Sequence, residues 1–140
     1  MQHMADLNRR LFLSSAMAAA LCAKTGQAAP VPAPPSGQGM IIVYRPRRAV
    51  GAALLFSTTV NGATIGNLTN GRMLAHAVAP GNHTIETVSA SVGGVATVST
   101  SVQAGQTVFV RAEARMGYPA GRPSLALVSS QQGQSEVSAL

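Results

Sequence analysis

A group of arginines contains the residues of this chain best suited to binding chemistry. Arg45, Arg47 and Arg48 surround a proline directly after an apolar run. Guanidinium groups form paired hydrogen bonds with carboxylates and phosphates, so a loop that presents three of them can bind an anion. Tyr118 and Arg122, in a later segment rich in Gly and Pro, are expected to extend this patch. The alternative is a solvated loop that only aids solubility.

Residue types for catalysis or metal binding are sparse. After residue 28 the chain has no Asp, and Glu86 and Glu113 are isolated in separate predicted strands, where they do not form the carboxylate pair that acid–base work needs. His76 and His83 flank a Pro-Gly turn and could approach each other across a hairpin. We interpret them as ordinary surface or edge histidines and not as metal ligands. The sequence predicts no enzyme, no metal site and no cofactor.

The N-terminus has the organisation of a signal peptide over residues 1–28. A basic segment ends at Arg9 and Arg10, and the apolar stretch of 13 residues that follows is too short to span a bilayer. The two arginines with Phe12 and Leu13 resemble the twin-arginine export signal. The alternatives are the general secretory route and a basic amphipathic helix of the mature protein.

Cleavage is predicted after Ala28, which leaves a periplasmic or otherwise exported protein without a transmembrane segment. Lipid attachment at Cys22 is a minor alternative, because Leu21 stands where lipoprotein signals have a small residue. Cys22 is the single cysteine, so its removal with the signal would leave no thiol for disulfides or catalysis.

The net charge of +6 does not indicate nucleic-acid binding once it is divided along the chain. Dense basic tracts and ladders of stacking aromatics are absent, and scarce acids explain the high pI better than abundant bases do. Beyond residue 28 the chain has three glutamates, no lysine, and seven arginines, at positions 45, 47, 48, 72, 111, 115 and 122.

The mature chain is predicted to be one small domain after a spacer. The prolines predict an extended tether over residues 29–38. Residues 132–140 are expected to form a polar C-terminal tail. Between them, over residues 39–131, short β-branched runs alternate with Gly, Asn and Pro, a pattern that predicts an all-β fold. We expect a small antiparallel β-sandwich of about seven to eight strands. The predicted strands are 40–45, 53–60, 63–67, 72–78, 82–90, 95–102, 107–115 and 123–129.

Turn residues and alternation add detail to this fold. Asn61-Gly62 is the strongest turn signal, because both residue types accept the positive φ of a type I′ hairpin. Alternation divides residues 107–115 into a core-facing side, with Val108, Val110, Ala112 and Ala114, and an opposite side. That opposite side, with Thr107, Phe109, Arg111, Glu113 and Arg115, includes a solvated stripe of alternating charge.

Several short sequence motifs, in their order along the chain, resemble a known family. They lie at residues 39–46, 60–68, 78–85, 104–107 and 122–128. Their order is similar to that of the bacterial domain-of-unknown-function family 2846, over about residues 38–131, and the middle part is also similar to PEGA-type surface modules. The resemblance implies an envelope-associated β-sandwich, often lipid-anchored in relatives, and it implies no established reaction.

These observations predict an exported, non-catalytic, envelope-associated binding or structural module. The expected partner is an envelope protein or an anionic envelope component, with nucleic acid excluded; the oligomeric state and the ligand stay open. One alternative is a sugar- or cell-wall-binding module. The small number of aromatics after residue 28 disfavours it, because ring stacking usually recognises sugars; the four are Tyr44, Phe56, Phe109 and Tyr118. Another is a small hydrolase.

Overall fold

The computed structural model describes residues 31–90, 94–115 and 121–140. The predicted export signal at Arg9, Arg10, Phe12 and Leu13, the lipidation alternative at Cys22, and Tyr118 lie outside the described residues. Within them the chain forms eight strands and one helix: β1 (Gly39–Tyr44), β2 (Phe56–Val60), β3 (Ala63–Leu68), β4 (Met73–Val78), β5 (Gly81–Ser89), β6 (Val95–Val102), β7 (Thr107–Arg115), β8 (Arg122–Val128) and α2 (Ser130–Ser138).

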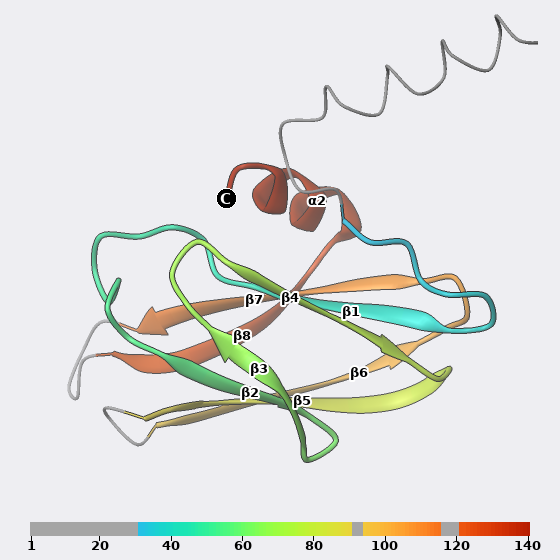
Figure 1. Cartoon of the computed structure of the whole chain (residues 1–140), viewed down its shortest axis with the longest axis horizontal. Coiled ribbons are helices and arrows are strands. Elements are labelled where there is room, and N and C mark those ends of the chain that lie inside the picture. Colours follow the sequence, from blue (N-terminus) through green and yellow to red (C-terminus); the bar gives the residue numbers. More distant parts are fainter. Residues whose placement is uncertain (1–30, 91–93, 116–120) are drawn as a thin grey trace, which may run out of the picture. The chain divides into compact units, whose positions relative to one another are not determined.

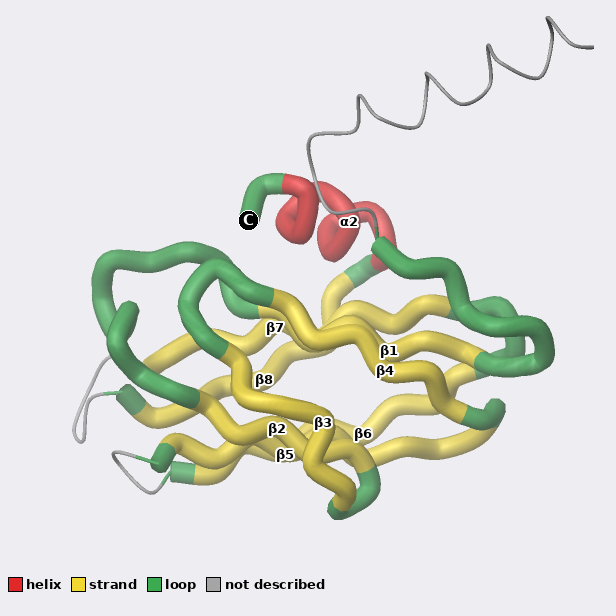
Figure 2. Tube along the Cα trace, viewed as in Figure 1, coloured by secondary structure: helices red, strands yellow, loops and turns green. Residues whose placement is uncertain are grey.

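The strands form two four-stranded sheets that pack face to face (Figures 1 and 2). Sheet A has the order β4-β1-β7-β8, and sheet B has the order β3-β2-β5-β6. The predicted all-β sandwich is confirmed, and every predicted strand overlaps an observed one. Asn61 and Gly62 join β2 to β3 with φ values of 51° and 83°, the positive pair that a type I′ turn requires.

One strand pair departs from the predicted antiparallel arrangement. β1 and β7 run parallel, with Met40 opposite Thr107 and Tyr44 opposite Arg111. A parallel pair cannot be joined by a tight turn, and here the connection passes through the whole of sheet B. Turn-forming residues show where the chain reverses, but they do not show which distant strands pair. The parallel pair was therefore not predicted. Its consequence is that β1 and β7 end on the same side of the sandwich.

The main core lies between the sheets and follows the predicted alternation. Val110 and Ala112 of β7 are fully buried there, with Val108 and Ala114 packed against them. In β6 the odd-numbered Thr97, Ser99 and Ser101 are exposed, whereas Val102 is buried. Ile41, Val43, Phe56, Leu68 and Ile85 complete the centre of this core.

The outer face of sheet A is covered in part by α2, in the segment expected to be a polar tail (Figure 1). Ser129 caps the helix by accepting a hydrogen bond of 3.2 Å from the Gln132 N–H. Val137 packs on Ile42, Tyr44 and Phe109 in a second apolar cluster. Phe109 was expected on a solvated face and is buried instead, because α2 lies over it.

Gly133 allows this close approach of helix and sheet. A Cβ at this position would meet the Cβ, Cγ and Cδ1 atoms of Phe109 far inside contact distance. Only two residues of α2 are buried, Gly133 and Val137, four positions apart on one side of the helix. Such a short apolar side, one of its members a glycine, gives too weak a periodic signal for a helix to be predicted.

Candidate functional site

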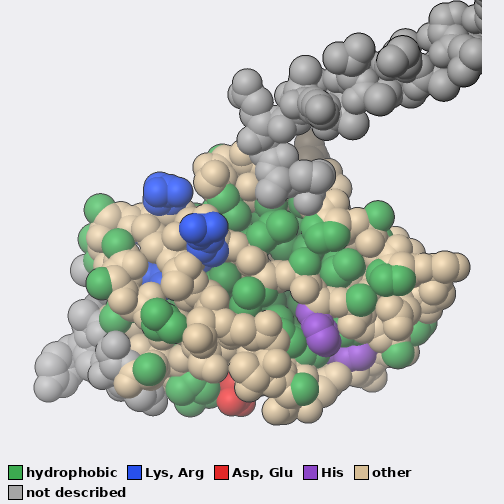
Figure 3. All heavy atoms as spheres, viewed as in Figure 1, with side chains coloured by type: hydrophobic (Ala, Val, Ile, Leu, Met, Phe, Trp, Pro, Cys, Tyr) green, Lys and Arg blue, Asp and Glu red, His purple; other side chains and the backbone are tan. Residues whose placement is uncertain are grey.

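One end of the sandwich collects most of the arginines. Because β1 and β7 are parallel and each has an antiparallel neighbour, β1 and β7 end where β4 and β8 begin. We call this the arginine end. The arginines visible in Figure 3 lie toward one side of the molecule, and the histidines lie toward the other. The arginine end carries Arg45, Arg47, Arg48, Arg72, Arg115 and Arg122, while Arg111 lies within β7.

Arg45 does not belong to the exposed set that the sequence predicted. Its side chain is buried, with 2% of the residue exposed, and it stacks over the Phe56 ring at 4.5 Å from the centroid. Its Nη1 donates to the Leu54 carbonyl at 2.7 Å, and its Nη2 donates to the Gly51 carbonyl. Burial lowers the pKa of Arg45. Both terminal nitrogens thus bind carbonyls of the chain, and the side chain is buried, so Arg45 shapes the loop that follows and does not present its charge at the surface.

Arg47 and Arg48 are exposed, as predicted. The Arg48 backbone N–H donates to Oδ1 of Asn70 at 2.9 Å, which ties the β1–β2 loop to the β3–β4 turn. Arg47 lies beside Gly71 of the same turn. The structure therefore brings two of the three clustered arginines to the surface in a loop that a neighbouring turn supports.

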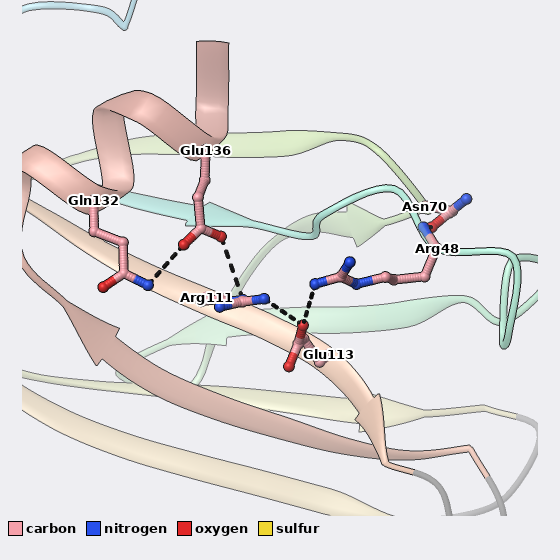
Figure 4. Close-up of polar contacts among 6 residues, drawn as sticks. All are labelled: Arg48, Asn70, Arg111, Glu113, Gln132 and Glu136. Atoms are coloured by element: carbon pink, nitrogen blue, oxygen red, sulfur yellow. Dashed lines mark hydrogen bonds and ion pairs between the residues drawn. The ribbon is translucent and has the colours of Figure 1, made fainter. Parts of the chain in front are cut away.

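Two of the glutamates serve a network on the outer face of sheet A (Figure 4). Glu113 accepts from Arg111 Nη2 at 2.7 Å and pairs with Arg48 Nη2 at 3.4 Å. Arg111 Nε lies 3.4 Å from a carboxylate oxygen of Glu136 in α2, whose other oxygen accepts from Gln132 at 2.7 Å. The predicted charged stripe is therefore paired through Arg111 and Glu113, and it also holds the helix.

Few carboxylates of the chain are left to neutralise the positive charge of the arginine end. Within the described residues Glu113 is the only carboxylate that pairs with an arginine of this end, and its partner there is Arg48. Glu86 lies on β5, between inward-facing neighbours, so it faces outward from sheet B. No ion pair of the described chain involves Arg47, Arg72, Arg115 or Arg122.

Arg115 and Arg122 stand directly opposite each other on β7 and β8. Like charges at facing positions repel, and an anion between them would remove that repulsion. Both side chains line a pocket of about 310 Å³ together with Thr97 and Ser124. Arg115 was expected in the solvated stripe of alternating charge with Arg111 and Glu113; no carboxylate pairs with Arg115 among the residues that the structure describes.

An apolar loop, residues 49–55, lies next to these arginines. Val50 and Leu55 are 55% and 41% exposed. The loop lines a shallow pocket of about 480 Å³ with Ala114 and Gly121, and a smaller one of about 270 Å³ with Arg48 and Glu113. The prediction missed this feature because it assigned part of the loop to a strand. The run of seven consecutive uncharged residues between Arg48 and Phe56 was the available signal.

The carboxylates and histidines considered for catalysis or metal binding do not come together in one site. Glu86 and Glu113 face outward from opposite sheets, so the core separates them. His76 lies in sheet A and His83 in sheet B, and both ring nitrogens of His83 are occupied, by Asn61 at 2.8 Å and the Ala79 carbonyl at 2.7 Å. In residues 31–90, 94–115 and 121–140 no three metal-ligating side chains gather. Over the same ranges no helix has the length and apolarity to cross a membrane.

Comparison with known proteins places the chain in a family without assigning a role. No curated protein matches it. A family model described as a protein of unknown function, DUF2846, matches residues 35–123, close to the range over which the resemblance was seen. That match covers β1 to β7 and the first two residues of β8, which include every arginine of the arginine end. Because the match spans well over half of the 140 residues, the chain belongs to the DUF2846 family.

Proposed function

We propose that the protein is an exported, non-catalytic module of the cell envelope that binds an anionic envelope component through its arginine end. The observation that supports this function is the group Arg47, Arg72, Arg115 and Arg122, which has no carboxylate partner in the described chain. Clustered charges of one sign raise the local concentration of oppositely charged partners. Guanidinium groups also bind carboxylate and phosphate oxygens in a defined, two-pronged geometry.

Neither alternative from the sequence gains support from the geometry. A sugar-binding module needs exposed rings, and Tyr44, Phe56 and Phe109 are buried. A hydrolase acting through two carboxylates needs them on one site, whereas Glu86 and Glu113 face outward from opposite sheets. The non-catalytic role is therefore the one that we carry forward.

Export is the part of the proposal that rests on the N-terminal sequence. The arginine pair and the apolar stretch after it predict transport by the twin-arginine route. Arg9→Lys/Arg10→Lys keeps the charge and is expected to leave the protein in the cytoplasmic fraction as an uncleaved precursor. Normal export of this variant would contradict the twin-arginine route, and cytoplasmic location of the unsubstituted protein would contradict export altogether.

Crosslinking in the envelope fraction, followed by capture and mass spectrometry, tests the binding role. The test variant replaces Arg47, Arg72, Arg115 and Arg122 with Ser, and its matched control replaces the same four residues with Lys. We expect an anionic partner that the Ser variant loses and the Lys variant retains in part, since Lys keeps the charge but not the fork of donors. A partner captured equally by the Ser variant would refute binding through the arginine end.

A further inference from the structure

The apolar loop is an unusual connection for an exposed position. Residues 49–55 contain only Ala, Val, Leu and Gly, and Val50 and Leu55 expose 55% and 41% of their surface. Exposed loops normally consist of polar and turn-forming residues, and exposed apolar side chains that gather in one patch mark contact surfaces. The apolar loop is therefore a candidate for contact with a nonpolar environment.

Arg45 prepares the backbone of this loop for such an environment. Its guanidinium binds the carbonyls of Gly51 and Leu54 from the inside, and the Leu54 N–H also donates to the Gly51 carbonyl at 3.0 Å. Polar backbone groups that enter a lipid phase unpaired are strongly disfavoured. By binding these carbonyls internally, Arg45 leaves the exposed side chains as the outward surface of the loop.

The charges around the loop complement an anionic lipid surface. Arg47 and Arg48 directly precede it, and Arg72, Arg115 and Arg122 lie at the same end of the sandwich. Apolar side chains bordered by arginines match the layers of a bilayer, in which phosphates lie above acyl chains. Protein interfaces, in contrast, are usually centred on Trp, Tyr or Arg, and the loop itself has no aromatic residue.

We propose that the apolar loop inserts into the surface of a bilayer containing anionic phospholipids, while the surrounding arginines bind the phosphates. This inference rests on the proposed function, because it identifies the anionic component as a membrane. Each arginine near an anionic surface is expected to contribute about fivefold to the partition coefficient. Val50 and Leu55 together are expected to contribute about tenfold.

Vesicle sedimentation separates the two contributions, with the protein isolated from its own cells in its naturally processed form. The probes are phosphatidylcholine vesicles with and without an equal share of phosphatidylglycerol. Arg47→Ser/Arg48→Ser should lower partitioning into the anionic vesicles about 25-fold. Val50→Ser/Leu55→Ser should lower it about tenfold. Leu127→Ser is the matched control, because Leu127 is 46% exposed on β8, outside the loop, and its replacement should have no effect.

Tryptophan fluorescence provides an independent readout of insertion. The chain has no Trp, so a single introduced indole reports only its own position. Val50→Trp should show a blue shift of its emission with anionic vesicles, and Leu127→Trp should show none. Circular dichroism of each variant in solution establishes that it is folded before its binding is compared.

The possible results distinguish this inference from the proposed function. Binding that depends on the arginines but not on Val50 and Leu55, or Val50→Trp without a blue shift, overturns insertion and leaves anion binding in place. Arginine-dependent capture of a wall polymer or an acidic protein, with no binding to vesicles, likewise overturns only the membrane inference. Absence of both vesicle binding and an arginine-dependent partner overturns both proposals.

Discussion

Gly133→Ala in α2 is the substitution for which helix propensity and packing predict opposite results. In an exposed helix interior, Ala is more favourable than Gly by about 1 kcal/mol. Here the new Cβ would lie 2.5 Å from both Cβ and Cδ1 of Phe109, and closer still to Cγ. Ordinary carbon–carbon contacts are about 3.5–4.0 Å, so the helix or the ring must move by roughly 1 Å.

The packing cost is expected to exceed the gain in propensity. Phe109 is 1% exposed, and one of the contacted atoms is its own Cβ, so rotation of the ring alone cannot relieve the overlap. Overpacking of this kind costs about 1–3 kcal/mol. Displacement of α2 would also expose Val137, which is 6% exposed in the native fold. The net loss in free energy of unfolding is then about 1–2 kcal/mol, or roughly 4–8 °C in Tm for a domain of this size.

Thermal and urea denaturation of Gly133→Ala and Ser135→Ala measure this balance. Ser135 is exposed in the same helix, so its replacement should leave the stability unchanged or raise it by up to about 0.5 kcal/mol. A Gly133→Ala protein as stable as the unsubstituted one, or more stable, would refute the close seating of α2 on Phe109.

Three further predictions follow from buried and paired side chains. Arg45→Met should lower the free energy of unfolding by about 2–4 kcal/mol in urea denaturation, because two loop carbonyls lose a charged donor, and Arg45→Lys should restore only part. Burial, and then the charge of Glu136, raise the pKa of Tyr44 to about 12. The folded state thus keeps a proton that the unfolded chain loses near pH 10, and stability should fall between about pH 10 and 12, a decline absent from Tyr44→Phe. Glu113→Gln should change stability by less than about 1 kcal/mol, because its ion pairs are partly exposed, and should strengthen binding to anionic vesicles by releasing Arg48.

The strands were predictable because local signals agree along most of the domain. Turn residues such as Asn61-Gly62 mark the reversals, and alternation in β6 and β7 identifies the core-facing side. Pairing between distant strands leaves no comparable trace, and the parallel contact of β1 with β7 therefore came only from the structure. Thr58 and Thr87 lie opposite each other in sheet B, and both are fully buried. Their burial likewise results from the strand pairing and could not be predicted from their polar side chains.

The candidate site was predictable in residue type and only partly in role. Arg47, Arg48 and Arg122 are exposed, as expected from their positions after or before predicted strands. Arg45 is adjacent in sequence but continues the inward-facing side of β1, so its guanidinium turns over Phe56 and into the loop. A cluster of like residues in a sequence therefore need not share one environment.

The positive character of the arginine end is a consequence of topology more than of net charge. The parallel pairing places the end of β7 beside the end of β1, which brings Arg115 and its partner Arg122 to the side that carries Arg47 and Arg48. The Glu113 and Glu136 carboxylates are drawn to Arg111, where they join the helix to the sheet. These acids thus join elements of the sandwich on its outer face, whereas Arg47, Arg72, Arg115 and Arg122 have no carboxylate partner among the described residues.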